Sequence, residues 1–558
     1  MKITYLTITA IFLIANLLAQ DQELEESMDF LKENTVPVKD KRTEYRQTFS
    51  YDPENYLLLS ISIVDSRKGE EIIMSVNAID INPFLVKFEP SKEVVEITAG
   101  TNGGRDLVKV VEDGEIQNYD DELLFYASGI EEARQLADAL KAVAEHAKEN
   151  SETLLTVSND KQTLLNEIDN AIQEVKVNDD VYVQDFSFDS ENNNIVTFKI
   201  SNAAGNEVEQ FTVNIADLNL HKIDFETDRE EVVIPLVTKG ERDLIAYTEN
   251  GETGNYTNEL ELKVNSIEEA RMLEAQLEAL VAMAEKEETV DYSSFSYQKC
   301  LDILRNNIGQ VVINQDAYDQ EFKVSSENDF VFIYTLNDVS EGEKYEYVVN
   351  AADFGKIPVN FDTDKNSVLI ELKTAGDREL IRITENDEDV DYESEMEIRS
   401  PDVETARELA AVFSRFNQLA LEKMEKSVAF PNVSEAENYV LSAVADVVVE
   451  TDTYQQSLEK GSSECLLKYN LTDVSDDTQY VYEFNLKDVD VNKIHFETDG
   501  GEALVTIQIK GGNDLIQVYE NGEADDFTDE FQMKAKDIEQ ARKLETALKM
   551  MTESCMEN

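Results

Sequence analysis

Apolar and polar residues alternate along a series of short runs, and the second quarter of the chain shows this pattern most clearly. Seven runs follow one another there, separated by Gly, Asn and Asp: VQDFSFD, IVTFKIS, EQFTVNIADL, KIDFETD, EVVIPLVT, DLIAYTENGE and NELELKV. Alternation with a period of two between turn-forming residues is typical of antiparallel strands that bury one face. The pattern therefore predicts seven strands in this part of the chain.

The spacing of apolar residues changes to three and four directly after the seventh run. The residues at this spacing are Ile267, Ala270, Leu273 and Leu277. They share one face of a helix, and we expect that face to be buried against the preceding strands. Ser266, followed by Glu269 three residues later, forms a capping box that marks the first turn of the helix.

The same order of elements occurs four times, and one stretch marks each copy. VNIADLNLHKIDF begins at Val213, and its counterparts are VNAIDINPFLVKF, VNAADFGKIPVNF and FNLKDVDVNKIHF. The Asn-x-x-Asp pairs of the four stretches are Asn77/Asp80, Asn214/Asp217, Asn350/Asp353 and Asn485/Asp488. Successive Asn positions lie 137, 136 and 135 residues apart, which indicates a four-fold tandem repeat. We define repeat 1 as residues 21–148, repeat 2 as 149–286, repeat 3 as 287–425 and repeat 4 as 426–558.

Further helical segments precede the strands of repeats 2, 3 and 4, near residues 161–175, 296–308 and 435–447. We expect these helices to pack between neighbouring repeats, because only short polar turns connect them to the preceding long helix. The predicted fold class is α+β. Each repeat is expected to be a seven-strand antiparallel barrel or strongly bent sheet closed by a C-terminal amphipathic helix, with connecting helices between repeats.

Seven strands followed by one amphipathic helix is an element order that resembles the pleckstrin-homology-like barrel superfold. The resemblance concerns element order only, and no sequence motif accompanies it. It implies a barrel, whereas an open antiparallel sheet with a helix across one face is the alternative. The chain contains no Trp, although the family's last helix usually carries one. The family's phosphoinositide site needs basic residues in the first strand-to-strand loop. In repeat 2 of this chain that loop reads DSENNN, so the resemblance does not imply lipid binding here.

The chain begins MKITYLTITAIFLIANLLAQ, in which Lys2 precedes an uninterrupted apolar run and small residues follow. This order is typical of a secretory signal peptide, which we assign to residues 1–20. We therefore expect a secreted, periplasmic or extracellular protein. A retained N-terminal anchor is the alternative interpretation of the same run.

The formal net charge of -69 limits the classes of partner. A surface this acidic repels phosphate backbones and anionic lipid. We therefore expect no nucleic acid and no anionic membrane among the partners, and an unknown protein or glycan partner remains. The same charge is also explained by solubility alone.

Acidic clusters follow a predicted hairpin in each repeat, and they are the candidates for a metal site. Calcium binds several oxygens from one compact loop, which makes candidates of the acids in two of these clusters. They are Asp387, Asp389, Asp391, Asp525, Asp526 and Asp529. None has the spacing of a helix-loop-helix calcium site, so weak calcium binding competes with the simpler interpretation of solvated hairpin tips.

Other polar residues recur with the repeat. Asn and Asp at the end of a strand commonly fix a turn, which is how we interpret the Asn-x-x-Asp pairs. An arginine recurs in the last helix of each repeat, where we expect it to pair with an acid on the helix or the adjacent sheet. These arginines are Arg134, Arg271, Arg407 and Arg542. The three cysteines do not recur with the repeat, so one incidental bridge and one leftover thiol are compatible with the sequence.

No catalytic constellation is found along the chain. The three histidines occupy unrelated positions, and there is no nucleophile, zinc or phosphate-loop motif. We therefore expect no catalytic residues, no cofactor, and a secreted, non-enzymatic interaction or structural protein. The alternatives are a secreted hydrolase that uses two carboxylates and a surface protein that binds divalent cations weakly.

Overall fold

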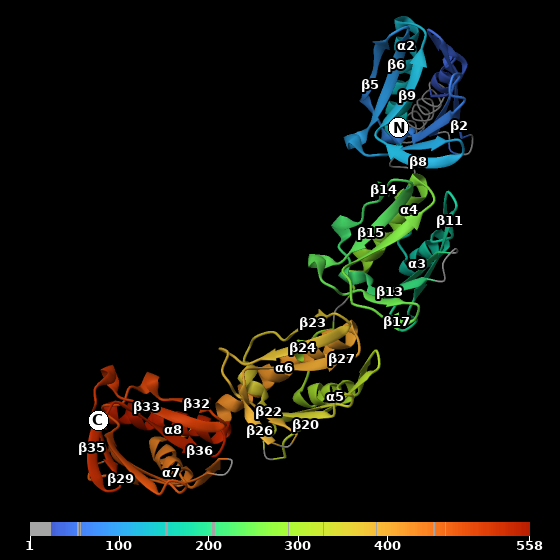
Figure 1. Ribbon diagram of the computed structural model, residues 1–558. Coiled ribbons are helices and arrows are strands. Elements are labelled where there is room, and N and C mark those ends of the chain that lie inside the picture. The colour runs from blue at the N-terminus through green and yellow to red at the C-terminus, as the bar shows by residue number, and fades with distance from the viewer. Residues whose placement is uncertain are drawn as a thin grey trace, which may run out of the picture. The chain divides into compact units, whose positions relative to one another are not determined.

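A computed structural model describes residues 24–557 of the chain, except 53–54, 56, 151–154, 203–206, 288–289, 327, 387, 450–451 and 464. The signal peptide expected at residues 1–20 lies outside this range. The chain divides into two compact units, Met1–Glu288 and Thr289–Asn558. The first unit contains repeats 1 and 2, and the second contains repeats 3 and 4 (Figure 1). Within the described residues, no helix combines the length and the apolar character needed to cross a membrane.

Each repeat contains a short first helix, two antiparallel sheets and a long last helix. Repeat 1 has a helix over residues 24–34, a sheet of β1 (Val38–Asp40), β2 (Thr43–Tyr51), β3 (Leu58–Asp65), β4 (Glu71–Asn77), β7 (Val108–Glu112) and β8 (Glu115–Asp120), a sheet of β5 (Ile81–Ser91), β6 (Val94–Thr101) and β9 (Glu122–Ala127), and α2 (Ile130–Asn150). Repeat 2 has α3 (Lys161–Ala171), a sheet of β10 (Val175–Val177), β11 (Asp180–Phe188), β12 (Ile195–Asn202), β13 (Val208–Asn214), β16 (Ala246–Glu249) and β17 (Glu252–Thr253), a sheet of β14 (Glu226–Asp228), β15 (Glu231–Val237) and β18 (Glu259–Val264), and α4 (Ile267–Ala284).

The second unit repeats this order. Repeat 3 has α5 (Tyr297–Asn307), a sheet of β19 (Val311–Ile313), β20 (Asp316–Val324), β21 (Val331–Asp338), β22 (Glu343–Asn350), β25 (Ile381–Glu385) and β26 (Glu388–Glu393), a sheet of β23 (Asn360–Asp364), β24 (Ser367–Lys373) and β27 (Glu395–Ser400), and α6 (Val403–Ser427). Repeat 4 has α7 (Val433–Ala443), a sheet of β28 (Val447–Val449), β29 (Asp452–Lys460), β30 (Leu466–Asp473), β31 (Thr478–Asn485), β34 (Ile516–Glu520) and β35 (Glu523–Thr528), a sheet of β32 (His495–Asp499), β33 (Glu502–Gln508) and β36 (Glu530–Ala535), and α8 (Ile538–Glu557).

The repeated stretch lies where the chain leaves the first sheet for the second. In repeat 2, β13 ends at Asn214, whose side chain accepts a hydrogen bond from the backbone N–H of Ala216 and starts a single 3-10 turn. Asn77 and Asn350 start the same turn in repeats 1 and 3. The turn interpretation of these asparagines is therefore confirmed.

The two sheets correct the expected strand count. Six strands form one sheet and three form the other, so the described part of each repeat has nine strands and no closed barrel. The additional strands in repeat 2 are β10 and β17, which contain only three and two residues. Segments this short cannot show alternation, so the sequence pattern does not reveal them.

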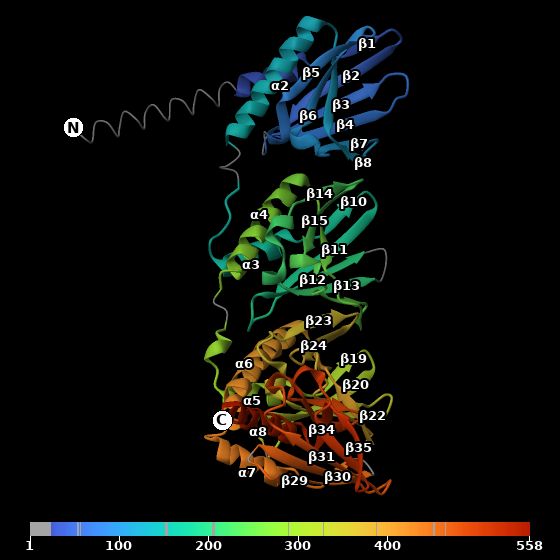
Figure 2. The ribbon, with the colours of Figure 1, turned by 90° about the vertical axis from the view of Figure 1, so that its left-hand side faces the viewer.

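Both helices of a repeat contribute to its core. In α4, all four residues of the predicted apolar face are buried, and Ser266 caps the first turn by accepting a hydrogen bond from Glu269 N–H. The expected position of the short helices between repeats was wrong. Leu164, Leu165 and Ile168 of α3 are fully buried in the core of repeat 2 itself, where α3 contacts α4 and β11. In Figure 2, α2 lies along β5 and β6, and α4 lies along β15.

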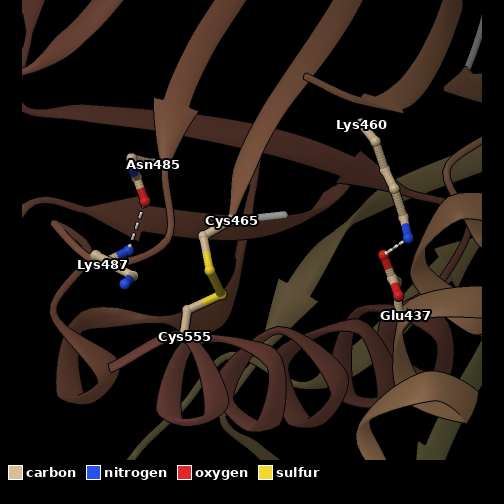
Figure 3. Close-up of a disulfide and its surroundings, with 6 residues drawn as sticks. All are labelled: Glu437, Lys460, Cys465, Asn485, Lys487 and Cys555. Atoms are coloured by element: carbon tan, nitrogen blue, oxygen red, sulfur yellow. Dashed lines mark hydrogen bonds and ion pairs between the residues drawn. A yellow bond between two sulfur atoms is a disulfide. The ribbon is translucent and has the colours of Figure 1, made fainter. Parts of the chain in front are cut away.

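One disulfide joins the first sheet of repeat 4 to its last helix (Figure 3). Cys465, directly before β30, is bonded to Cys555 in the last turns of α8, 90 residues further along the chain. Cys300 in α5 is buried and unbridged. The bridge fastens the end of the long helix to the six-stranded sheet.

We expect the Cys465→Ser/Cys555→Ser variant to lose about 4 kcal/mol of stability in repeat 4, because closing a loop of this length restricts the unfolded chain. Thermal unfolding of the oxidised wild type, the reduced wild type and the variant measures this loss. The reduced wild type should melt with the variant, and reductant should not change the melting of the variant. A wild type whose melting ignores the reductant contradicts the prediction.

Candidate functional site

The most ordered set of recurring polar residues lies at the junction between two repeats of one unit. In the second unit, Arg542 of α8 reaches back to Asp353 in the 3-10 turn that follows β22. Its Nη2 donates to both carboxylate oxygens, at 2.6 and 2.8 Å. Asp353 and Arg542 are only 6% and 8% exposed. The pair is therefore a buried, charge-assisted contact between repeats.

The first unit contains the same contact at the corresponding positions. Arg271 of α4 donates through Nη2 to the two oxygens of Asp80, at 2.7 and 2.9 Å. The asparagine of the motif also takes part, because Asn77 Nδ2 donates to Glu268 Oε1 at 3.3 Å. In the second unit, Asn350 Nδ2 donates to Glu539 Oε1 at 2.8 Å. Both polar residues of the motif thus contact the first turn of the next repeat's last helix.

A second group of contacts surrounds the phenylalanine that ends the repeated stretch. Arg378 of repeat 3 donates to the carbonyl oxygen of Phe496 at 2.7 Å, and its guanidinium lies 4.1 Å from the centre of that ring. Arg105 of repeat 1 contacts the carbonyl oxygen and ring of Phe225 in the same way. Cations that lie over aromatic faces and keep part of their contact with solvent contribute about 0.5–1 kcal/mol. This ring is therefore a binding surface for the arginine of the preceding repeat.

Threonine and leucine side chains complete the junction. Thr227 donates to the backbone oxygen of Asp106 at 2.8 Å. The corresponding Thr498 donates to the backbone oxygen of Glu379. Leu107 is buried in the core of repeat 2, although it belongs to repeat 1, and Leu380 of repeat 3 is buried in the core of repeat 4. A leucine of the preceding repeat is thus part of the apolar core on the far side of each junction.

Burial sets the electrostatics of the ion pairs. Loss of solvent raises the pKa of Asp80, and Arg271 opposes the rise. The same desolvation raises the pKa of Asp353 to about 6, against the attraction of Arg542. Desolvation thus outweighs the attraction that each arginine returns. The pairs select one arrangement of the two repeats, whereas the apolar contacts contribute the favourable free energy.

A groove lies beside each ion pair. The groove in the first unit has a volume of about 590 Å³ and is lined by Asn77, Asp80, Glu268 and Arg271, among others. The groove in the second unit, of about 550 Å³, is lined by the corresponding Asn350, Asp353 and Glu539. Its carboxylates already accept hydrogen bonds from Arg542 and Asn350. These acids hold the junction together and do not form a free acid and base pair.

The metal candidates lie elsewhere. Asp525 and Asp526 are exposed on β35, and Asp529 is half-buried and accepts a hydrogen bond from Gln508 Nε2 at 3.3 Å. Asp389 and Asp391 belong to β26, and Asp387 lies outside the described residues. Among the side chains that the structure describes, no three His, Cys, Asp or Glu residues form a group that could hold a metal ion.

Both members of the ion pair recur visibly in the sequence, but the sequence did not identify them as partners. The motif aspartate was expected to fix a turn, and the partner of the arginine was expected on the same helix or the adjacent sheet. Arg134 does pair with Glu131 on its own helix, whereas Arg271 and Arg542 reach the preceding repeat. The available signal was the nearly constant offset, which is 191 residues for Asp80/Arg271 and 189 for Asp353/Arg542.

No family model, curated protein or solved structure matches the chain.

We expect Arg542→Met to cost about 3 kcal/mol, because it leaves the Asp353 carboxylate buried without its partner. Asp353→Leu should cost less, since Glu539 lies 3.7 Å from Arg542 and still balances its charge. The double variant should be close to wild type. Hydrogen exchange of residues 350–355 and thermal unfolding measure these effects.

The chain provides matched controls for this cycle. Arg134→Met and Asp488→Leu change the corresponding positions of repeats 1 and 4, which are partly exposed. Both should stay within about 0.5 kcal/mol of wild type. Equal losses in the two single variants and the double variant would contradict the assigned coupling.

The Arg542→Met variant should also lose stability as the pH rises from about 4 to 8. The raised pKa of Asp353 means that the folded state retains a proton which the unfolded state releases, so unfolding becomes easier with increasing pH. Removing the arginine strengthens this dependence, and Asp353→Leu/Arg542→Met should abolish it. Unfolding midpoints measured across this pH range for the three proteins test the prediction. A parallel pH dependence in the single and double variants would exclude Asp353 as the source.

Proposed function

We propose that the chain is an exported, non-enzymatic tandem-repeat protein with a structural or interaction role. The observation that carries this proposal is the junction: two pairs of repeats are joined by the same ion pair, the same phenylalanine contact and the same buried leucine. Recurring polar residues that elsewhere would suggest a binding or catalytic site thus connect repeats to each other.

Joined repeats present related surfaces at a fixed separation to one partner, which we infer to be a protein or glycan. Two weak contacts on one rigid unit gain avidity, because the second contact forms at a high effective concentration. The dense negative charge of the chain favours partners other than nucleic acid and anionic membranes.

Two features support export. The first residues have the order of a signal peptide, and Cys465 is bonded to Cys555. Stable disulfides are typical of proteins that leave the reducing cytosol.

The alternative of a two-carboxylate hydrolase has weaker support. That reaction needs a carboxylic acid and a carboxylate that are both available to the substrate. In the junction grooves, Asp80 and Asp353 are each engaged by two hydrogen bonds from arginine. The observed geometry therefore favours the structural role.

The proposal predicts that binding depends on intact junctions. We expect full-length wild type to dissociate at least about tenfold more slowly from envelope or extracellular protein and glycan fractions than Arg271→Met/Arg542→Met, because avidity needs repeats held together. Surface-plasmon resonance with the immobilised full chain measures this ratio. Arg67→Met, on an exposed loop of repeat 1, serves as the matched control and should dissociate like wild type. Turnover of glycan, ester or peptide substrates by the purified full chain would overturn the non-enzymatic assignment.

A further inference from the structure

Each junction joins two different faces. The downstream face of a repeat is the part that carries the motif aspartate and the buried leucine. In repeat 3 these residues are Asp353 and Leu380. The upstream face is the part that carries the phenylalanine and the start of the last helix with its arginine. In repeat 4 these residues are Phe496 and Arg542. The copies of these faces that lie outside the junctions described above include the downstream face of repeat 4 and the upstream face of repeat 1.

The downstream face of repeat 4 exposes apolar residues that are buried at the junctions. Leu515 is 51% exposed, whereas its counterparts Leu107 and Leu380 are 4% and 3% exposed. Phe527 is 54% exposed, whereas its counterpart Tyr119 is 7% exposed and belongs to the core of repeat 2. A repeat face intended for water carries polar residues at such positions. This face therefore retains the apolar half of a junction.

The polar half of the same face is also in place. Asn485 accepts a hydrogen bond from the N–H of Lys487, which is the turn that Asn77 and Asn350 form in repeats 1 and 3. Asp488 is half-buried, and its carboxylate has no ion-pair partner among the residues that the structure describes. The turn thus already presents an aspartate in the position of Asp80 and Asp353.

The upstream face of repeat 1 offers the complementary groups. Ile130 is 51% exposed, whereas its counterpart Ile267 is 6% exposed at the junction of repeats 1 and 2. Arg134 occupies the position of Arg271 and Arg542, and its side chain is half-exposed beside Glu131. This face therefore carries an exposed apolar residue and the arginine that the opposite face lacks.

We propose that the downstream face of repeat 4 binds the upstream face of repeat 1 of a second copy of this chain, with Asp488 paired to Arg134. The contact deepens the structural role proposed above and rests on it. Charge complementarity selects this head-to-tail arrangement, because two repeat 4 faces would bring Asp488 against Asp488 and two repeat 1 faces would oppose Arg134 to Arg134. Contacts between unlike faces form rings when they close and filaments when they do not.

Two substitutions make this contact weaker than the junctions within the chain. Asn513 occupies the position of Arg105 and Arg378, and its Nδ2 donates to the local backbone oxygen of Lys510. Pro90 occupies the position of Thr227 and Thr498, so it provides no hydroxyl donor. The contact retains the ion pair and the apolar residues but loses these two hydrogen-bonding groups. We therefore expect reversible association that depends on protein concentration.

The net charge of -69 gives the contact a characteristic salt dependence. Two copies repel each other over long distances, and salt screens that repulsion. A pair that is buried on docking is screened much less. Added salt should therefore strengthen the association up to the point where the long-range repulsion is screened.

Sedimentation velocity of the full chain over a concentration series tests the proposal. Wild type should form concentration-dependent multimers, and Asp488→Arg and Arg134→Asp should each weaken association at least about tenfold, because like charges then face each other. An equimolar mixture of the two variants should associate again, since each variant restores an opposite charge for the other. Asn513→Arg, which rebuilds the contact to phenylalanine, should strengthen the association of the otherwise wild-type chain.

Two control variants carry the same changes of charge on exposed loops away from these faces, Glu191→Arg in repeat 2 and Arg67→Asp in repeat 1. Both should associate like wild type. A wild type that stays monomeric at its highest soluble concentration overturns the inference, and so does association that Asp488→Arg or Arg134→Asp leaves unchanged. A mixture of the two variants that stays monomeric overturns it as well.

The two proposals fail separately. Association is read from sedimentation of Asp488 and Arg134 variants, whose changes leave the Asp80/Arg271 and Asp353/Arg542 pairs intact. The structural role is read from dissociation kinetics of Arg271→Met/Arg542→Met and from substrate turnover. A monomeric wild type with junction-dependent binding overturns only the head-to-tail contact, whereas substrate turnover overturns the function.

Discussion

A buried carboxylate that faces an arginine of the neighbouring repeat is the constraint on which the pairing of repeats depends. Asp80 with Arg271 and Asp353 with Arg542 are largely withdrawn from water, and the cost of that withdrawal exceeds the attraction within each pair. The favourable free energy comes from apolar residues such as Leu107 and Leu380, which are buried in the core of the next repeat. Apolar contact alone tolerates several arrangements. A buried charge without its partner is unfavourable in all arrangements but one, so the pair fixes which arrangement forms.

One short stretch carries the residues for both sides of this arrangement. In VNIADLNLHKIDF, the asparagine starts a turn, the aspartate position faces the following repeat in repeats 1 and 3, and the phenylalanine eight residues after it contacts the arginine of the preceding repeat in repeats 2 and 4. The turn also moves the chain from the six-stranded to the three-stranded sheet. A substitution in this stretch therefore affects the fold of its own repeat and the contact with a neighbour together. This is the physical reason that the stretch is the most recognisable part of each copy.

The sequence predicted those features that depend on nearby residues. Alternation located the longer strands, and the spacing of Ile267, Ala270, Leu273 and Leu277 identified a helix face that is buried in the structure. The two-residue strand β17 was too short for any periodic pattern, and strand order alone did not distinguish one sheet from two. The candidate site was missed because a chain with 118 acids offers every arginine many nearby partners. Only the recurrence of Asp80/Arg271 as Asp353/Arg542 separates the true partner from the others.

The acidity of the chain and the construction of its junctions belong to one physical problem. With 49 basic and 118 acidic residues, neighbouring repeats repel each other, and so do separate copies. Repulsion of this kind suppresses contacts that offer apolar area alone. Two faces can overcome this repulsion only when their contact both buries apolar area and pairs opposite charges. Leu107 and Asp80 provide the two in the first unit, and Leu380 and Asp353 provide them in the second. High net charge and a few arginines at the junctions therefore act together. The net negative charge disfavours non-specific association, and each junction arginine favours contact with one specific face of another repeat.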